Sequence, residues 1–237
     1  MTAHPARRHA NFFLVSLFLA AAPAQASTCY GRVGAGSIAG AVALPAAGPN
    51  FEAYSRLGVQ MGRTHVHTRV RDVLLEAYAA LARDAPGKYF VYGETGLENG
   101  GRMRPHRTHQ NGLSVDFMVP VVNGKGKSVP LPSSPLNRFG YGLEFDAGGR
   151  ADELRIDFEA LAAHLVQLRE AARRNKVGIA LVILDPPLIA EVMKTSQAKK
   201  LHGLPFMKGK PWIRHDEHYH VDFALPCRPG RAQARAG

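Results

Sequence analysis

The segment HRTHQNGLSVDFMVPVV, residues 106–122, joins a polar loop to an alternating run of apolar and polar residues. The alternating half predicts a β-strand that carries Asp116. The polar half holds His106 and His109, and Gly112 lies where the loop must turn into the strand. Imidazole and carboxylate groups are the ordinary ligands of zinc. The segment is therefore either part of a metal site or an ordinary polar loop. The rest of the sequence is needed to distinguish these two alternatives.

A second histidine-rich segment lies near the C-terminus. It reads HDEHYH over residues 215–220 and runs into YHVDFAL, whose alternation predicts another strand. His218 and His220 are two residues apart, so a strand places both imidazoles on one face. Asp222 follows on the same face and competes with Asp116 as a candidate ligand.

Together the two segments supply enough donors for a catalytic zinc. His109 and Asp116 are seven residues apart, and a loop that turns into a strand can bring both to one point. A catalytic zinc uses three protein ligands and keeps one position open for water. With His218 and His220, these groups predict three ligands and one base. The alternative is a set of surface histidines, although five of the 11 histidines fall in these two segments.

The N-terminus has the pattern of a secretory signal peptide. A basic start is followed by about a dozen apolar residues, fewer than the ~20 that a membrane span needs. The A-x-A pattern at Ala24–Ala26 predicts cleavage after Ala26, so residues 1–26 form the signal peptide and residues 27–237 one domain. The alternative is an uncleaved membrane anchor. After cleavage we expect no stable insertion in a membrane.

The chain is strongly basic, with a formal net charge of +11. A cationic surface attracts polyanions. Because the protein is expected to be exported, its partner is more plausibly an anionic polymer of the cell envelope or a membrane surface. We exclude nucleic acid as a partner. The alternative is an ordinary solvated surface, because the lysines and arginines are scattered along the chain.

Only two cysteines occur, Cys29 and Cys227, and they bracket almost the whole exported chain. In an oxidising compartment a disulfide between them would tie the two ends together. Two free buried thiols are the alternative. Neither cysteine belongs to a CxxC pair, which argues against a cysteine-based zinc cluster.

Helical and strand patterns alternate along the remaining chain. Together they predict an α+β fold, in which a small antiparallel sheet with flanking helices carries the zinc site. We expect residues 29–50 to be an extended loop and residues 120–150 to be an irregular insertion with one hairpin near FGYGLEF. His164 is expected to be a structural or surface histidine rather than a ligand. The predicted regular elements are helices at 67–84 and 158–174, strands at 89–93 and 179–184, and a short helix after Asp185.

Two stretches resemble the penicillin-insensitive murein endopeptidases, zinc peptidases that share an HxxxxxxD and an HxH motif. These stretches are GGRMRPHRTHQNGLSVDFMVP and KPWIRHDEHYHVDFALPC. The resemblance implies that the zinc ligands are His109, Asp116 and His220, and that His218 is the catalytic base. It also implies that His106 and His215 lie near the metal or contact the substrate. The 120–150 region contains no Asp-x-x-His pattern, so the sequence does not point to a second metal site there.

The resemblance further implies a periplasmic enzyme that hydrolyses D-alanyl–diaminopimelate amides in peptidoglycan crosslinks. The chain has no HExxH or GxSxG pattern, and a serine nucleophile is not expected. Arg102 is a candidate to stabilise the developing oxyanion, and protonated His106 or His215 is the alternative for this role. Arg102 could instead be a loop arginine paired with a carboxylate. Asp216 and Glu217 are expected to form a charged turn or to hold a histidine tautomer.

Two other functions fit the same residues. A zinc D,D-carboxypeptidase or dipeptidase would trim a free peptide end, whereas a cell-wall-binding protein with degenerate chemistry would cut nothing. The preferred crosslink and the oligomeric state do not follow from the sequence.

Overall fold

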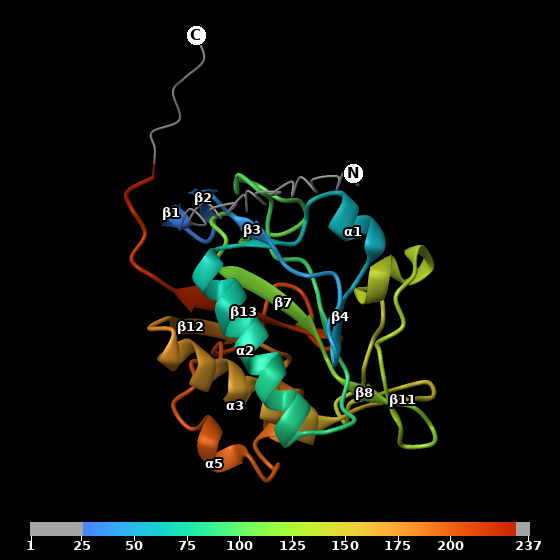
Figure 1. The fold of residues 1–237 in the computed structure, drawn as a ribbon. Coiled ribbons are helices and arrows are strands. Elements are labelled where there is room, and N and C mark those ends of the chain that lie inside the picture. The colour runs from blue at the N-terminus through green and yellow to red at the C-terminus, as the bar shows by residue number, and fades with distance from the viewer. Residues whose placement is uncertain (1–25, 231–237) are drawn as a thin grey trace, which may run out of the picture.

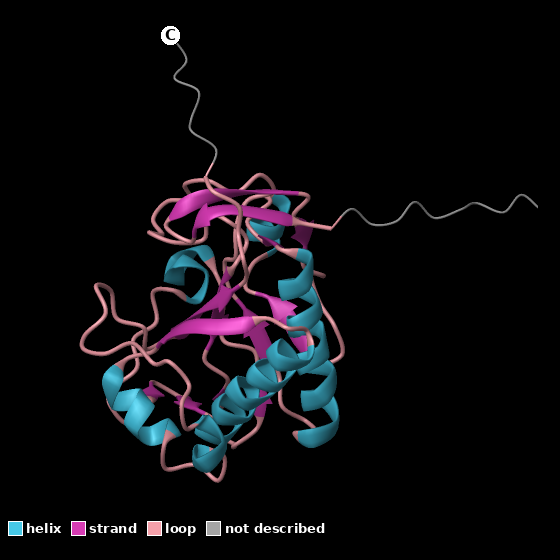
Figure 2. Ribbon diagram, turned by 90° about the vertical axis from the view of Figure 1, so that its left-hand side faces the viewer, coloured by secondary structure: helices cyan, strands magenta, loops and turns pink. Residues whose placement is uncertain are grey.

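The computed structural model describes residues 26–230 and has an α+β fold. The predicted signal peptide lies outside these residues except for its last position. A five-stranded sheet runs through the middle of the protein, and smaller sheets lie around it (Figures 1 and 2). No helix in the described part of the chain is long and apolar enough to cross a membrane.

The central sheet is antiparallel except at one edge. Its strands, in spatial order, are β12 (Gly178–Ile183), β13 (His218–Ala224), β7 (Ser114–Met118), β6 (Phe90–Tyr92) and β4 (Phe51–Ala53). The pair β4 and β6 is parallel. A parallel pair needs a long crossover connection, and the chain between these strands contains a long helix that supplies it. The predicted antiparallel sheet with flanking helices is present, and it carries one parallel pair at its edge.

Two amphipathic helices, α2 (Thr68–Asp84) and α3 (Phe158–Arg174), pack against each other on one side of the sheet (Figures 1 and 2). Both predicted helices are confirmed, and α2 begins one residue later than predicted. Its N-cap is His67, whose Nδ1 accepts a hydrogen bond from the backbone of Arg69. The carboxylate of Asp157 caps α3 in the same manner.

Strand alternation assigns the side chains of β7 and β13 to two faces. Phe117 and Tyr219 face the helices, where their rings stack 5.3 Å apart and His164 of α3 lies 4.9 Å from Phe117. Asp116 and His220 therefore project from the opposite face. Of the structural and surface positions expected for His164, the structure shows the buried one, and this burial lowers the pKa of His164 to about 3.

The stretch predicted as an N-terminal loop instead contains strands. A hairpin of β1 (Thr28–Arg32) and β2 (Ala35–Ala39) precedes β3 (Val42–Ala43), which pairs with β5 (His65–Val66). Glycine-rich sequence gives little local strand pattern. The hairpin is held from far along the chain, because Gly31 donates to the carbonyl of Arg228 at 2.9 Å. Helix α1 (Arg56–Gln60) follows β4.

The 120–150 region is also more regular than predicted. It contributes to a four-stranded sheet and contains the 3₁₀ segment η1 (Pro135–Gly140). The hairpin expected near FGYGLEF is wrong, because Arg138 and Phe139 adopt left-handed backbone conformations that no strand uses. The strands of this sheet are β8 (Val121–Val122), β9 (Ser128–Val129), β10 (Arg150–Ala151) and β11 (Leu154–Ile156).

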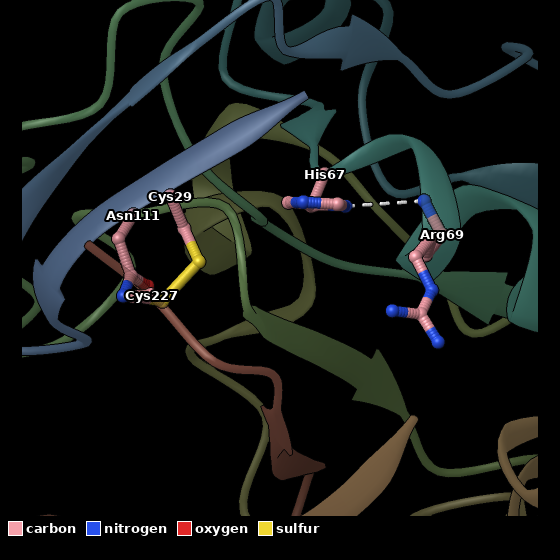
Figure 3. Close-up of a disulfide and its surroundings, with 5 residues drawn as sticks. All are labelled: Cys29, His67, Arg69, Asn111 and Cys227. Carbon is pink, nitrogen blue, oxygen red and sulfur yellow. Dashed lines mark hydrogen bonds between the residues drawn. A yellow bond between two sulfur atoms is a disulfide. The ribbon is translucent and has the colours of Figure 1, made fainter. Parts of the chain in front are cut away.

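A disulfide joins Cys29 in β1 to Cys227, just beyond β13 (Figure 3). The predicted bond is confirmed, and no free cysteine remains in the described residues. Asn111 lies beside the bond, with its Nδ2 3.7 Å from the Cys227 sulfur. The short helices α4 (Pro186–Val192), which begins after Asp185 as predicted, and α5 (Ala198–Leu201) complete the fold.

The buried imidazole of His164 predicts a specific pH dependence of stability. An unfolded histidine titrates near ~6.5, well above the folded value of about 3. The unfolded chain therefore binds one more proton between these values, so stability falls as pH falls below about 6.5. The slope from this group is about 1.4 kcal/mol per pH unit. We expect His164→Phe, which keeps an aromatic ring, to show a shallower slope in urea unfolding.

His202 offers a matched control because its side chain is exposed. His202→Gln should keep the slope of the parent protein. Identical slopes for the parent and His164→Phe would show that the buried imidazole does not titrate as stated.

Candidate metal centre

Three side chains meet at one carboxylate oxygen. In the register of β13 and β7, His220 lies directly opposite Asp116. Nδ1 of His220 lies 2.8 Å from Oδ1 of Asp116, and Nε2 of His109 lies 3.2 Å from the same oxygen. All three residues are buried. The structure therefore brings together the three side chains that the sequence predicts as zinc ligands.

The loop before β7 places His109 at this oxygen. Both His109 and Gly112 have positive φ, of 65° and 76°. A Cβ on Gly112 would lie 2.9 Å from the backbone nitrogen of His67 and 2.5 Å from Cδ1 of Ile38. Only glycine fits this turn, which brings His109 back beside the strand that carries Asp116.

The protonation of His109 leaves a lone pair that is suited to a cation. Nδ1 lies 2.9 Å from the carbonyl of Thr95, which cannot donate, so Nδ1 must carry the proton. Nε2 then has only a lone pair, and it has no hydrogen-bond partner among the described residues. Burial lowers the pKa of His109, which disfavours a second proton. A buried lone pair that faces a carboxylate is unfavourable unless a cation lies between them.

His220 is held between two carboxylates. Its Nε2 lies 2.8 Å from Oδ1 of Asp222, which also accepts a hydrogen bond from the hydroxyl of Ser114 at 2.6 Å. Burial by itself lowers the pKa of His220, but Asp222 and Asp116 outweigh it and raise that pKa to about 10. Asp222 therefore contacts His220 from its far side and orients the ring, as outer partners of metal ligands do.

The cluster also includes His106. The potential ligand atoms of His106, His109 and Asp116 all lie within 4.8 Å of one another, so this cluster could hold a metal ion. Nε2 of His106 is hydrogen-bonded to Glu94, and its Nδ1 lies 3.7 Å from Oδ2 of Asp116. His106 is thus an alternative third ligand to His220.

Glu94 is a buried carboxylate at the centre of a polar network. It accepts hydrogen bonds from the hydroxyl of Tyr54 at 2.8 Å and from Nη2 of Arg63 at 3.0 Å, and it is bonded to His106. Burial raises its pKa, but the bonds with His106 and Arg63 prevail and lower that pKa to about 2. Glu94 therefore stays ionised and fixes the His106 ring.

His218 and His215 form a second imidazole pair, with ring centroids 4.5 Å apart. Nδ1 of His218 lies 2.7 Å from Glu217, so Glu217 holds the histidine tautomer as predicted. Burial opposes a charge on His218, but Glu217 and Asp116 prevail and raise its pKa. Nδ1 of His215 donates to the carbonyl of Ile213 at 2.7 Å, and burial lowers the pKa of His215 to about 4.

These groups line one cavity of about 360 Å³. His109 lies behind it, covered by Asp116, and is fully buried. The lining includes Trp212, which is 42% exposed. The cavity histidines and acids are His106, His215, His218, His220, Glu94, Asp116 and Glu217.

The structure changes the expected role of Arg102. Arg102 is exposed and lies in a neighbouring hollow, so it does not line this cavity. The arginines that do line the cavity are Arg63, Arg107 and Arg138, none of which was predicted from the sequence.

Tyr141 was also missed by sequence reasoning. It comes from the 120–150 region, and its hydroxyl donates to Oδ2 of Asp116 at 3.1 Å while accepting from the backbone of Glu94 at 2.8 Å. Oδ1 of Asp116 is thereby left facing the two imidazoles. A tyrosine between two glycines carries no local sign of this contact.

The chain was compared with known families and proteins. A family model described as "Penicillin-insensitive murein endopeptidase" matches residues 29–236. Among curated proteins no match was found.

The turn at Gly112 gives a prediction about stability. Gly112→Ala adds a methyl group that collides with backbone and core atoms, in addition to the strain of positive φ. We expect it to lower the free energy of unfolding by about 3 kcal/mol or more. Gly209→Ala is the matched control, because Gly209 also has positive φ but open space around its Cβ position. It should cost only about 1–2 kcal/mol. Equal losses in urea unfolding would contradict the steric argument.

Proposed function

Because the chain belongs to the penicillin-insensitive murein endopeptidase family, we propose that it is a zinc peptidase that hydrolyses D-alanyl–diaminopimelate amides in peptidoglycan crosslinks. The observation that carries the proposal is the buried Nε2 of His109, which faces Asp116 with no hydrogen-bond partner among the described residues. A cation at this position satisfies both groups. Two imidazoles and one carboxylate are a donor set typical of catalytic zinc.

We assign His109, Asp116 and His220 as the zinc ligands. Their donor atoms gather at one carboxylate oxygen, and each imidazole has an outer partner on its other nitrogen, Thr95 or Asp222. Such outer partners are a general feature of metal-binding histidines. His106 is the weaker candidate, because one of its nitrogens is already bound to Glu94. When bound, zinc would polarise the scissile carbonyl and lower the pKa of a water molecule.

His218 is the proposed general base. Glu217 holds the proton on Nδ1, so neutral His218 has its lone pair on Nε2. Nε2 takes a proton from the attacking water and returns it to the leaving amine. Glu217 and Asp116 stabilise the imidazolium that exists between these two transfers.

The remaining cavity histidines are proposed to bind the substrate. His215 keeps a neutral ring at ordinary pH because its pKa is about 4. Its Nδ1 donates to Ile213, so its Nε2 is an acceptor for a substrate N–H group. His106 is held by Glu94 at the other side of the cavity and contacts the peptide there.

We also propose that the chain is exported and acts in the periplasm as one catalytic domain spanning residues 27–237. The disulfide fits an oxidising compartment. The substrate class of the family, peptidoglycan, also lies outside the cytoplasm.

Digestion of purified sacculi tests the reaction. We expect chromatography of the muropeptides to show that crosslinked dimers disappear, that a chelator stops the loss, and that added zinc restores it. Dimers that persist while free peptide ends are shortened would indicate the carboxypeptidase instead. Activity that survives complete removal of the metal would contradict the zinc assignment.

Variants separate the base from the ligands. His218→Ala should keep bound zinc, as measured by elemental analysis, but lose about 10²–10⁴-fold in kcat/KM. His109→Ala should lose the metal and the activity together. His202→Ala, an exposed control, should match the parent in both measurements. A His218→Ala variant with the full activity of the parent would remove the proposed base and favour the cell-wall-binding alternative.

A further inference from the structure

A second hollow, of about 890 Å³, adjoins the catalytic cavity. The two share the lining residues Pro105, His106 and Arg107. We call this hollow the arginine groove. Residues 34–37 of the β1–β2 hairpin form one wall, and the loop of residues 101–110 forms the other. The groove therefore continues the cavity away from the metal centre.

The arginine groove is lined by positively charged side chains and by no negatively charged ones. Arg102, Arg104 and Arg107 line it, whereas no aspartate or glutamate does. All three arginines are exposed, and none forms an ion pair with a carboxylate in the described part of the chain. Arg107 lies over the ring of Trp212, 5.4 Å from its centroid, at the junction of groove and cavity. Three guanidinium groups are thus available to an anionic ligand.

The backbone that carries these arginines is fixed relative to the metal centre. The loop is closed by a hydrogen bond from Gly101 to Gln110 at 2.8 Å, and Gln110 also donates to Val33 in the hairpin region at 3.0 Å. Met103 is buried between Arg102 and Arg104 and anchors the loop. His106 and His109 belong to the same loop, so the spacing of the arginines from the catalytic groups is set by the chain.

We propose that the arginine groove binds free carboxylates of the crosslinked peptide while the scissile amide lies beside Asp116 and His218. This inference rests on the proposed function. A crosslinked peptide is longer than the cavity and must leave it, and the groove is an exit whose walls attract negative charge. Diaminopimelate keeps a carboxylate next to the amine that forms the crosslink. Guanidinium groups bind carboxylates through paired hydrogen bonds.

Binding to a chain that cannot cut the substrate tests the groove directly. Trp212 is the single tryptophan, and it lies at the junction, so its fluorescence reports occupancy. The probes are a purified soluble muropeptide dimer and the same dimer with its diaminopimelate carboxylates amidated. In a His218→Ala background we expect the free dimer to bind more tightly than the amidated one. Adding Arg102→Gln and Arg104→Gln should raise the Kd of the free dimer at least about fivefold and abolish this preference.

The control removes the same charge elsewhere. Arg83 and Arg173 are exposed on α2 and α3, on the helix side of the sheet. Arg83→Gln with Arg173→Gln should leave both dissociation constants unchanged. Equal weakening by the control pair would overturn the inference, because general charge would then explain binding. Equal affinity for the two dimers, or binding of neither, would also overturn it.

Cleavage by the chain with His218 intact is measured separately. Cleavage without discrimination between the dimers would overturn the groove and leave the proposed function standing. Discrimination without cleavage would support the groove and contradict the proposed function.

Discussion

The hydrogen-bonded pair of Asp116 and His220 is the contact on which the site depends. It exists because β7 and β13 pair in one register, with these residues directly opposite. A slip of one residue would turn one of them toward the helices. The register is held from the other face, where Phe117 and Tyr219 stack beneath His164. Packing on the helix side therefore determines the chemistry on the open side.

The site also concentrates buried carboxylates. Asp116, Asp222, Glu94 and Glu217 are all buried, and each is bonded to a histidine. Buried carboxylates persist as anions only where opposite charge and hydrogen bonds compensate them. Arg63 compensates the negative charge of Glu94, whereas protonated His220 compensates the charges of Asp116 and Asp222. A divalent cation at the proposed metal site would compensate these carboxylates in place of the proton on His220.

Residues with strong local patterns were predictable from the sequence. The helices around His164 and the strands around Asp116 and His220 follow hydrophobic periodicity, which reflects burial on one face. The meeting of His109 with Asp116 followed from spacing and the glycine turn. The hairpin at the N-terminus, the contact of Tyr141 and the network of Glu94 did not follow. Each depends on a partner at least 25 residues away in the sequence and leaves no periodic trace.

Arg102 lies outside the catalytic cavity, and its position shows how the outer parts of the fold support the site. Arg102 follows two glycines in a loop whose end is fastened to the β1–β2 hairpin, and the hairpin is fastened by the disulfide to the end of β13. Asn111, which follows His109 and Gln110 in the sequence, contacts the sulfur of Cys227 (Figure 3). The disulfide-linked segments around Cys29 and Cys227 thus hold in place the loop that carries both a metal-ligand candidate and the groove arginines. A basic residue in such a loop is held near the centre but outside it, where it can contact the parts of a long substrate that are not being cut.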